Sequence, residues 1–231
     1  MTSTAPSPLW YATRGSGYAA LVLLTASVVL GVLSAQRWRS EEWPRFLVQA
    51  VHRSVSLLVL AFLALHIATA VLDPFAGLGL RDALVPFSSS YRAVWLGLGV
   101  VAMELLVALV VTSLVRNRLG FRAWRAIHWL AYACWPLALV HGLGTGTDAA
   151  SGWGLLLDLC CVGAVVLAAG SRLLEGWPRQ ATLRLTLGTA ATVGLVAVAA
   201  WAVGGPLQPG WARAAGTPSR LLAPTPVGSV P

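Results

Sequence analysis

The chain has 231 residues, of which 57% are hydrophobic and only 10% are charged, and its net charge is +8. A soluble domain of this size carries about a quarter of charged residues, so the composition indicates a membrane protein. All sixteen basic residues are arginines, and they cluster in short connections between apolar runs. That distribution is typical of charge that sets topology beside a bilayer, and it argues against nucleic-acid binding.

A helix needs about 20 apolar residues to cross roughly 30 Å of hydrocarbon. Six segments are long enough: 17–35, 46–72, 92–115, 121–143, 152–171 and 181–203. The first could be read as a signal peptide, but arginines follow it more densely than they precede it, so we expect a retained helix. The sequence therefore predicts an all-α integral membrane protein with a six-helix transmembrane bundle.

The connections after the first, third and fifth segments and the residues that border them hold half of the basic residues. These are Arg37, Arg39, Arg45, Arg116, Arg118, Arg122, Arg172 and Arg179. The positive-inside rule places these connections in the cytoplasm and both termini outside it. We expect Trp38, Trp43, Trp124 and Trp177 at the cytoplasmic interface, and Trp95 and Trp153 at the outer one.

The remaining segments are short or poor in apolar residues. Residues 1–16 are expected to form an external N-terminal segment, and 73–90 an ordered external loop. Residues 204–231, rich in Pro, Gly, Ser and Ala, are expected to form a flexible external tail. Three cysteines, Cys134, Cys160 and Cys161, lie in apolar runs without a Cys-x-x-Cys-His sequence, which excludes covalent haem attachment. We interpret them as packing residues.

All four histidines fall in two of the predicted helices. His52 and His66 lie fourteen residues apart in the second helix, and His128 and His141 lie thirteen apart in the fourth. At about 1.5 Å per residue these separations are roughly 20 Å along each axis. Because both helices run outward from the cytoplasmic face, His52 matches His128 in depth and His66 matches His141.

Each matched pair offers two imidazole nitrogens across a gap that a porphyrin could fill, and two imidazoles give a six-coordinate haem iron suited to electron transfer. Arg53, Arg122 and Arg125 are candidates to pair with the propionates of the inner haem. The alternative is that the histidines are satisfied polar residues of a bundle core. Four histidines matched in depth argue against it, because ionisable residues inside a membrane are costly and usually functional.

A straight fourth helix would not present His128 and His141 in the same direction. Thirteen residues at about 100° each leave His128 and His141 roughly 140° apart around a straight helix. Pro136 lies between them, so we expect a kink or rewound turn there. Alternatively, His141 lies where the helix is already ending.

Two carboxylates fall within predicted spans, Glu104 in the third and Asp158 in the fifth. A carboxylate at bilayer depth is costly unless it is protonated or paired. Proton handling or quinone contact is one interpretation, and a hydrogen-bonded packing residue is the other.

The run 118–132, Arg-Leu-Gly-Phe-Arg-Ala-Trp-Arg-Ala-Ile-His-Trp-Leu-Ala-Tyr, contains a Gly-x-x-x-Trp-x-x-x-His pattern and is followed by His141. It resembles the ferric reductase-like transmembrane superfamily, which includes ferric reductases, NADPH oxidases and the haem-bearing membrane subunit of the bacterial methionine sulfoxide reductase system. The resemblance covers about residues 17–172 and leaves 173–203 as an additional helix. It implies two haem b groups between the second and fourth helices, with His52/His128 and His66/His141 as iron ligands.

The chain departs from the ferric reductases and NADPH oxidases in having no flavin- or nicotinamide-binding domain. Electrons would come from a flavin-binding or reductase partner protein or from membrane quinone, and any flavin would lie on that partner. We therefore expect an oxidoreductase component of a bacterial plasma membrane that passes electrons to an extracytoplasmic acceptor, such as ferric iron, a flavoprotein or a reductase partner. The alternatives are a quinol-oxidising or metal-reducing enzyme in its own right, and a haem-free structural or transport subunit whose histidines bind a metal or protons.

Overall fold

The computed structural model describes residues 7–36, 44–175 and 177–222, and all regular structure within these ranges is helical. Within these ranges, six spans are long and apolar enough to cross a membrane. They are α1 (Pro8–Ala35), α2 (Arg45–Leu72), α4 (Ala93–Leu114), the pair α6 (Phe121–His128) and α7 (Ala131–Thr145), α8 (Gly152–Leu174) and α9 (Ala181–Gly204). Short helices α3 (Leu80–Leu84), α5 (Arg116–Leu119) and α10 (Trp211–Ala214) and the 3₁₀ turn η1 (Ser219–Leu221) lie between or after them. The predicted all-α membrane bundle is confirmed.

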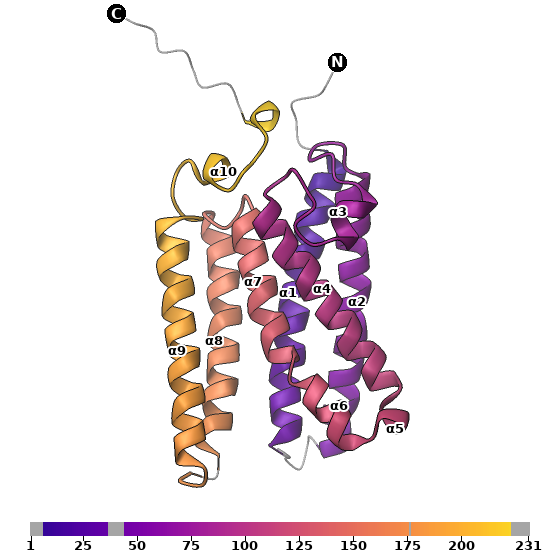
Figure 1. Cartoon of the computed structure of the whole chain (residues 1–231), viewed down its shortest axis with the longest axis vertical. Coiled ribbons are helices and arrows are strands. Elements are labelled where there is room, and N and C mark those ends of the chain that lie inside the picture. The colour runs from indigo at the N-terminus through magenta and orange to yellow at the C-terminus, as the bar shows by residue number, and fades with distance from the viewer. Residues whose placement is uncertain (1–6, 37–43, 176, 223–231) are drawn as a thin grey trace, which may run out of the picture.

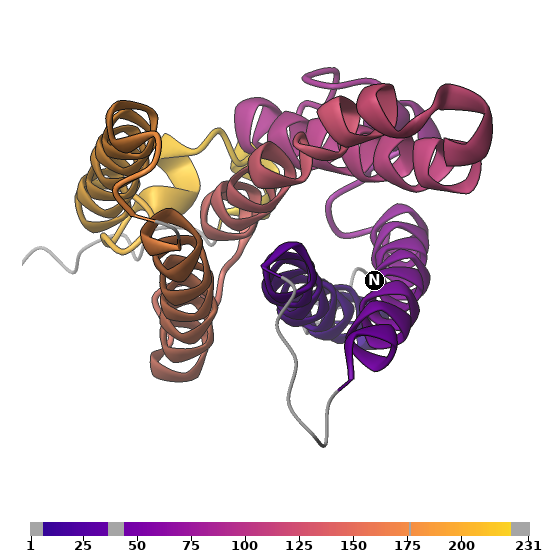
Figure 2. The same ribbon diagram turned by 90° about the horizontal axis from the view of Figure 1, so that it is seen from below.

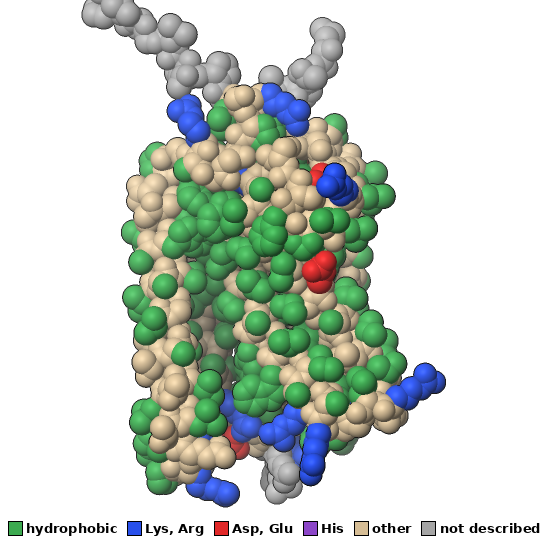
Figure 3. All heavy atoms as spheres, in the orientation of Figure 1, with side chains coloured by type: hydrophobic (Ala, Val, Ile, Leu, Met, Phe, Trp, Pro, Cys, Tyr) green, Lys and Arg blue, Asp and Glu red, His purple; other side chains and the backbone are tan. Residues whose placement is uncertain are grey.

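The spans run alternately up and down, so the chain enters and leaves the described bundle at the same end (Figure 1). We call this the capped end, since α3, α10 and η1 lie there, and the opposite one the basic end, since α5 and α6 carry four arginines to it. Arginines gather at the two ends of the molecule, with a largely apolar band between them (Figure 3). Arg37, Arg39, Trp38 and Trp43, predicted at the cytoplasmic face, lie outside the described residues.

The first helix begins nine residues before the predicted span. Ser7 caps it by accepting a hydrogen bond from the backbone N–H of Trp10 at 3.0 Å, and Pro8 occupies a first-turn position that needs no N–H donor. Residues 8–16, predicted to be an external segment, therefore belong to α1. Its 28 residues span about 42 Å, which exceeds the hydrocarbon thickness.

The fourth span is broken, but not at Pro136. The chain makes a tight turn at Trp129 and Leu130, where the backbone N–H of Leu130 donates to the carbonyl of Ile127 at 2.9 Å. Helix α7 then continues through Pro136. The helix is therefore not interrupted at this proline, and the rewound turn lies at Trp129 and Leu130 instead. A proline removes one N–H and forces a local adjustment, and α7 accommodates it without ending.

The predicted flexible tail is folded over residues 205–222. The Trp211 ring packs against Trp95 and Trp201, with ring centroids 5.3 and 5.8 Å apart, and its indole N–H donates to the carbonyl of Gly144 at 3.0 Å. Composition alone did not predict that this segment is folded, because a few aromatic contacts with distant helices hold it in place. The 73–90 loop is ordered as expected and contains α3; Asp73 is buried and accepts a hydrogen bond from the Ser7 hydroxyl at 3.2 Å.

Two antiparallel hairpins form the centre of the bundle. Helix α1 packs along α2, and α4 packs along α7, with α8 and α9 forming a third group (Figure 2). The core between them contains buried Trp135, whose indole N–H donates to the Thr25 hydroxyl at 2.9 Å, and buried Cys134, whose thiol donates to the carbonyl of Ala102 at 3.3 Å. Of the three free cysteines, Cys134 and Cys161 are buried and Cys160 is exposed. Most side chains of α9 are exposed, and in a bilayer they contact lipid.

Candidate functional site: two histidine pairs

The structure brings the four histidines together in two facing pairs. The ring centroids of His52 and His128 are 6.5 Å apart, and those of His66 and His141 are 6.2 Å apart. Within each pair the ring planes are nearly perpendicular, at 83° and 87°. His52 and His66 lie on α2, while His128 ends α6 and His141 lies near the end of α7. One pair lies toward the basic end and the other toward the capped end.

The break between α6 and α7 explains how His128 and His141 face the same helix. On one straight helix they would lie on different sides, because thirteen residues do not complete a whole number of turns. The tight turn at Trp129 and Leu130 replaces part of the regular helix with i to i+3 hydrogen bonds, which advance by about 120° per residue. The direction in which His141 points relative to His128 is thus set at this turn, six residues before Pro136.

The spacing within each pair suits two ligands of one metal ion. A metal–imidazole bond is about 2.0 Å long and a ring nitrogen lies about 1.15 Å from its centroid, so opposed imidazoles on one ion have centroids about 6.3 Å apart. The observed distances are 6.5 and 6.2 Å. No group of three or more His, Cys, Asp or Glu side chains fit to hold a metal ion occurs in the described part of the chain. Two protein ligands match a metal whose other ligands come from a prosthetic group.

Three of the histidines are oriented by a backbone carbonyl on a neighbouring helix. The Nδ1 atoms of His52, His66 and His141 lie 2.9, 2.8 and 2.9 Å from the carbonyl oxygens of Ser27, Thr13 and Trp95. A carbonyl can only accept, so each Nδ1 carries the proton and each Nε2 is left with a free lone pair. This is the tautomer that a metal ligand needs, and the hydrogen bond raises its basicity.

A glycine follows each of these carbonyls four residues later and makes room for the ring. A Cβ atom at Gly17 would lie 3.0 Å from His66 Nδ1, and one at Gly31 would lie 3.4 Å from His52 Cε1. At Gly99 it would lie 2.4 Å from His141 Nδ1, closer than real Cβ contacts allow. These carbonyl–glycine pairs were not identified from sequence. A signal was present, because Gly17 and Gly31 are fourteen residues apart, as are His52 and His66.

The fourth histidine is held differently. The Nδ1 atom of His128 is buried without a hydrogen-bond partner among the described residues. Its ring stacks on Trp124, with centroids 5.0 Å apart and planes inclined by 26°. The Trp124 indole N–H donates to the Ser113 hydroxyl of α4 at 3.2 Å.

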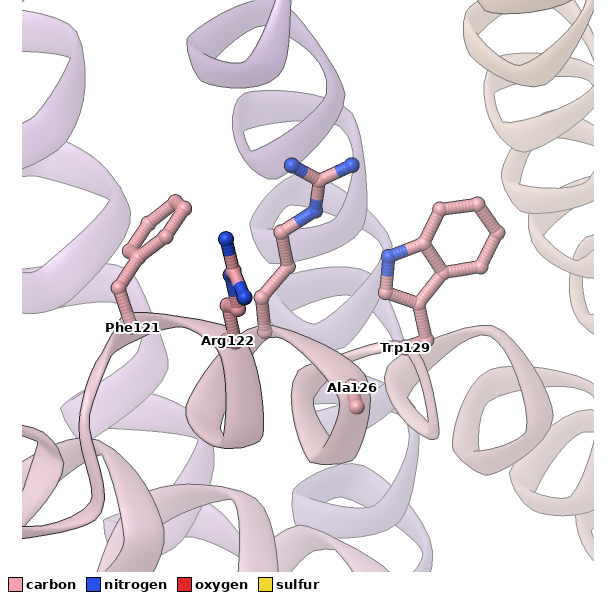
Figure 4. A pocket seen from close by; sticks show the side chains of 5 residues that line it. Phe121, Arg122, Ala126 and Trp129 are labelled. Carbon is pink, nitrogen blue, oxygen red and sulfur yellow. The ribbon is translucent and has the colours of Figure 1, made fainter.

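Two of the three arginines predicted beside the inner pair share one hollow. Arg122 and Arg125 line a hollow of about 250 Å³ with Phe121, Ala126 and Trp129. Figure 4 shows the side chains that line it, with Arg122 between Phe121 and Trp129. Arg53 is exposed on α2 next to His52 and is not part of this lining. The hollow combines two cations with aromatic walls, which suits the carboxylates of an aromatic prosthetic group.

The two intramembrane carboxylates lie in different environments. Glu104 is exposed on α4, whereas Asp158 is buried in α8. Within residues 7–36, 44–175 and 177–222, neither carboxylate forms a hydrogen bond with a histidine.

A buried arginine that was not singled out in the sequence lies beside the capped-end pair. Arg92 is buried, with 2% of its surface exposed, and its guanidinium donates to the carbonyls of Gly144 and Thr145, each at 3.0 Å, and to the Thr217 hydroxyl at 2.8 Å. It therefore neutralises the carbonyl end of α7, just after His141, and ties residues 216–217 to it. Burial raises the pKa of the neighbouring Tyr91 phenol, so this side chain stays neutral beside Arg92.

Comparison with known proteins gives one match. The family model described as "Ferric reductase like transmembrane component" matches residues 16–139, which is more than half of the chain. The matched region contains His52, His66 and His128, and it ends two residues before His141. No curated protein and no solved structure matches the chain. The two helix hairpins and the run 118–132 both lie largely within the match, and the chain belongs to the ferric reductase-like transmembrane family.

Proposed function

We propose that this protein carries single electrons across a bacterial plasma membrane through two haem b groups. One is held between His52 and His128, the other between His66 and His141. The observation that carries the proposal is the spacing of the two pairs, 6.5 and 6.2 Å between ring centroids, which suits opposed ligands of one iron. Family membership supports transmembrane electron transfer in general.

The side chains present fit haem better than a bare metal ion. Each pair supplies two neutral nitrogens, and a porphyrin would supply the other four ligands of a six-coordinate iron. When bound, such a group alternates between ferric and ferrous states and so accepts and releases one electron. Backbone carbonyls would orient the ligands, and Arg122 and Arg125, which line one hollow, would neutralise propionates at the basic end.

The distance between the pairs suits transfer along the bundle. Fourteen residues of α2 separate His52 from His66, which corresponds to about 21 Å. Porphyrin edges extend several ångströms from each iron, so the edges would lie much closer than the irons do. We infer that the basic end faces the cytoplasm and that electrons move outward to a redox partner or another external acceptor.

Haem content tests the proposal directly. The purified chain should show a b-type α-band on reduction and contain about two haems per chain by pyridine haemochrome. His66→Ala should remove one haem and leave the other, and Ser54→Ala, an exposed change on the same helix, should keep both. A well-folded preparation without haem would refute the proposal and favour a haem-free subunit.

A second candidate, oxidation of membrane quinol by this chain alone, is favoured by Asp158. This carboxylate is buried within a membrane span and could take up a proton released from a quinol. Quinol added to the purified chain should then reduce the haems, and Asp158→Asn should slow this reduction while leaving reduction by dithionite unchanged. Lack of reduction by quinol would leave a separate protein as the electron donor. Glu104, being exposed on α4, is a weaker candidate for the same role.

A further inference from the structure

Three of the four histidines, on α2 and α7, are held by the same arrangement, and the fourth, His128 on α6, is held differently. In α1–α2 the first helix supplies a carbonyl and a glycine four residues later, and the second supplies the histidine. In α4–α7 this arrangement recurs once, with Trp95, Gly99 and His141. The carbonyl–glycine arrangement therefore occurs in both hairpins and is not confined to α1.

At the fourth histidine, the position where the spacing in α1 leads one to expect a glycine holds a different residue. In α1 the two carbonyl–glycine pairs are offset by fourteen residues, Thr13 and Gly17 against Ser27 and Gly31. The same offset in α4 leads from Gly99 to Ser113. The Ser113 hydroxyl donates to the carbonyl of Leu109 at 2.7 Å, so that carbonyl already has a side-chain donor.

The short helix that carries His128 does little by itself to fix the orientation of the imidazole ring. Helix α6 has only eight residues, and it lies between Gly120, whose φ is +77°, and the break at Trp129. The buried Nδ1 atom of His128 lacks a partner in the described structure. The contact that remains is the stack on Trp124, four residues earlier and one helical turn away.

Trp124 is itself fixed at both its edge and its face. Its indole N–H donates to Ser113 on α4 at 3.2 Å, and the Phe121 ring lies 5.7 Å from it, inclined by 40°. The indole therefore connects His128 to a long helix that is part of the central packing. A serine in place of the expected glycine supplies the anchor for that connection.

We propose that Trp124 is the positioning residue of His128, anchored by Ser113, and that it replaces the carbonyl that orients each of the other three histidines. This inference rests on the proposed function and adds to it a difference between the two haem sites. A ligand without an Nδ1 hydrogen bond is less basic than one with it, so the His52/His128 haem is the more weakly held and depends on the stack. Removing an orienting partner of this kind typically weakens metal binding about 10- to 100-fold.

Four variants test the inference: Trp124→Ala, Trp124→Phe, Ser113→Ala and, as a control, Trp177→Ala. Trp177 is an exposed indole near the α8–α9 turn that lines a separate hollow without histidines. For each variant, haem per chain is measured by pyridine haemochrome, and the α-band is followed through a potentiometric titration. The haem of the His66/His141 pair serves as an internal control for folding.

Trp124→Ala should reduce the haem content from about two to about one per chain and remove only one component of the titration. Trp124→Phe keeps an aromatic face and should retain both haems, with the sensitive component shifted by less than tenfold in its ferric-to-ferrous preference, which is 59 mV for one electron. Ser113→Ala should lie between them, and Trp177→Ala should match the unmodified chain.

Retention of two haems with an unchanged titration in Trp124→Ala would overturn the inference while leaving the proposed function intact. Equal loss of both haems in Trp124→Ala and Trp124→Phe would also overturn it, since the indole would then serve folding. An unmodified chain without haem would refute the proposed function and this inference together.

Discussion

Alanine substitutions at the three glycines beside the histidines should have graded effects. At Gly99 a Cβ atom would lie 2.4 Å from His141 Nδ1, so the ring must move by about 1 Å to restore an ordinary contact. That movement breaks the hydrogen bond to Trp95 and would carry the ring nitrogen away from the proposed iron, to which a bond would be about 2.0 Å long. Gly99→Ala should therefore lose the haem of the His66/His141 pair.

The stability cost can be worked from the same distances. Overpacking costs about 1–3 kcal/mol, and the lost hydrogen bond adds about 1 kcal/mol. Alanine recovers about 1 kcal/mol through its helix propensity, leaving a net loss of roughly 1–3 kcal/mol. At Gly17 the closest atom would be 3.0 Å away and the effect smaller. At Gly31 it would be 3.4 Å away, so Gly31→Ala should be neutral or slightly stabilising.

The assay is thermal unfolding in detergent together with haem content. Gly15→Ala is the matched control, because this glycine lies on α1 near Gly17 and a Cβ atom there would meet nothing within 4 Å. Two haems and an unchanged unfolding temperature in Gly99→Ala would refute the reasoning, and so would damage in Gly15→Ala equal to that in Gly99→Ala.

Three further outcomes are expected. Arg92→Gln removes charged hydrogen bonds to Gly144, Thr145 and Thr217 and should lower the free energy of unfolding by about 2–4 kcal/mol. The loss should be seen as a lower unfolding temperature and as faster proteolysis within 205–222. Equal behaviour of the control Arg213→Gln, at an exposed site, would contradict this. Joint replacement of Arg122 and Arg125 by Gln should lower the midpoint potential of one haem. The free energy of its reduction should change by less than about 1 kcal/mol, because both side chains are exposed and screened. A shift confined to the His66/His141 haem would show that the hollow does not serve the basic-end pair. A reporter that is active only outside the cytoplasm should be active when fused after Pro231 and inactive when inserted at Gly120. The reverse pattern would invert the proposed orientation.

Much of the architecture was readable from the sequence, because the bilayer acts on each segment separately. A span must be apolar over about 20 residues, and its rise per residue is constant, so hydropathy located the six helices and spacing matched the histidines in depth. The pairing of His52 with His128 and of His66 with His141 needed only these two quantities. The N-terminal boundary was missed because the Ser7 cap extends α1 beyond the apolar run.

Tertiary structure decided how the matched histidines are aimed and held. The azimuth of His128 depends on the break at Trp129 and Leu130, and Pro136, the strongest local signal, did not mark it. The carbonyls that orient His52, His66 and His141 lie on neighbouring helices, 25 to 53 residues away in sequence, so no local pattern contains them. The order of 205–222 likewise arises from contacts with Trp95 and Arg92. Local sequence determines where an apolar segment crosses the membrane, whereas hydrogen bonds and close packing between distant segments determine which way its polar side chains point.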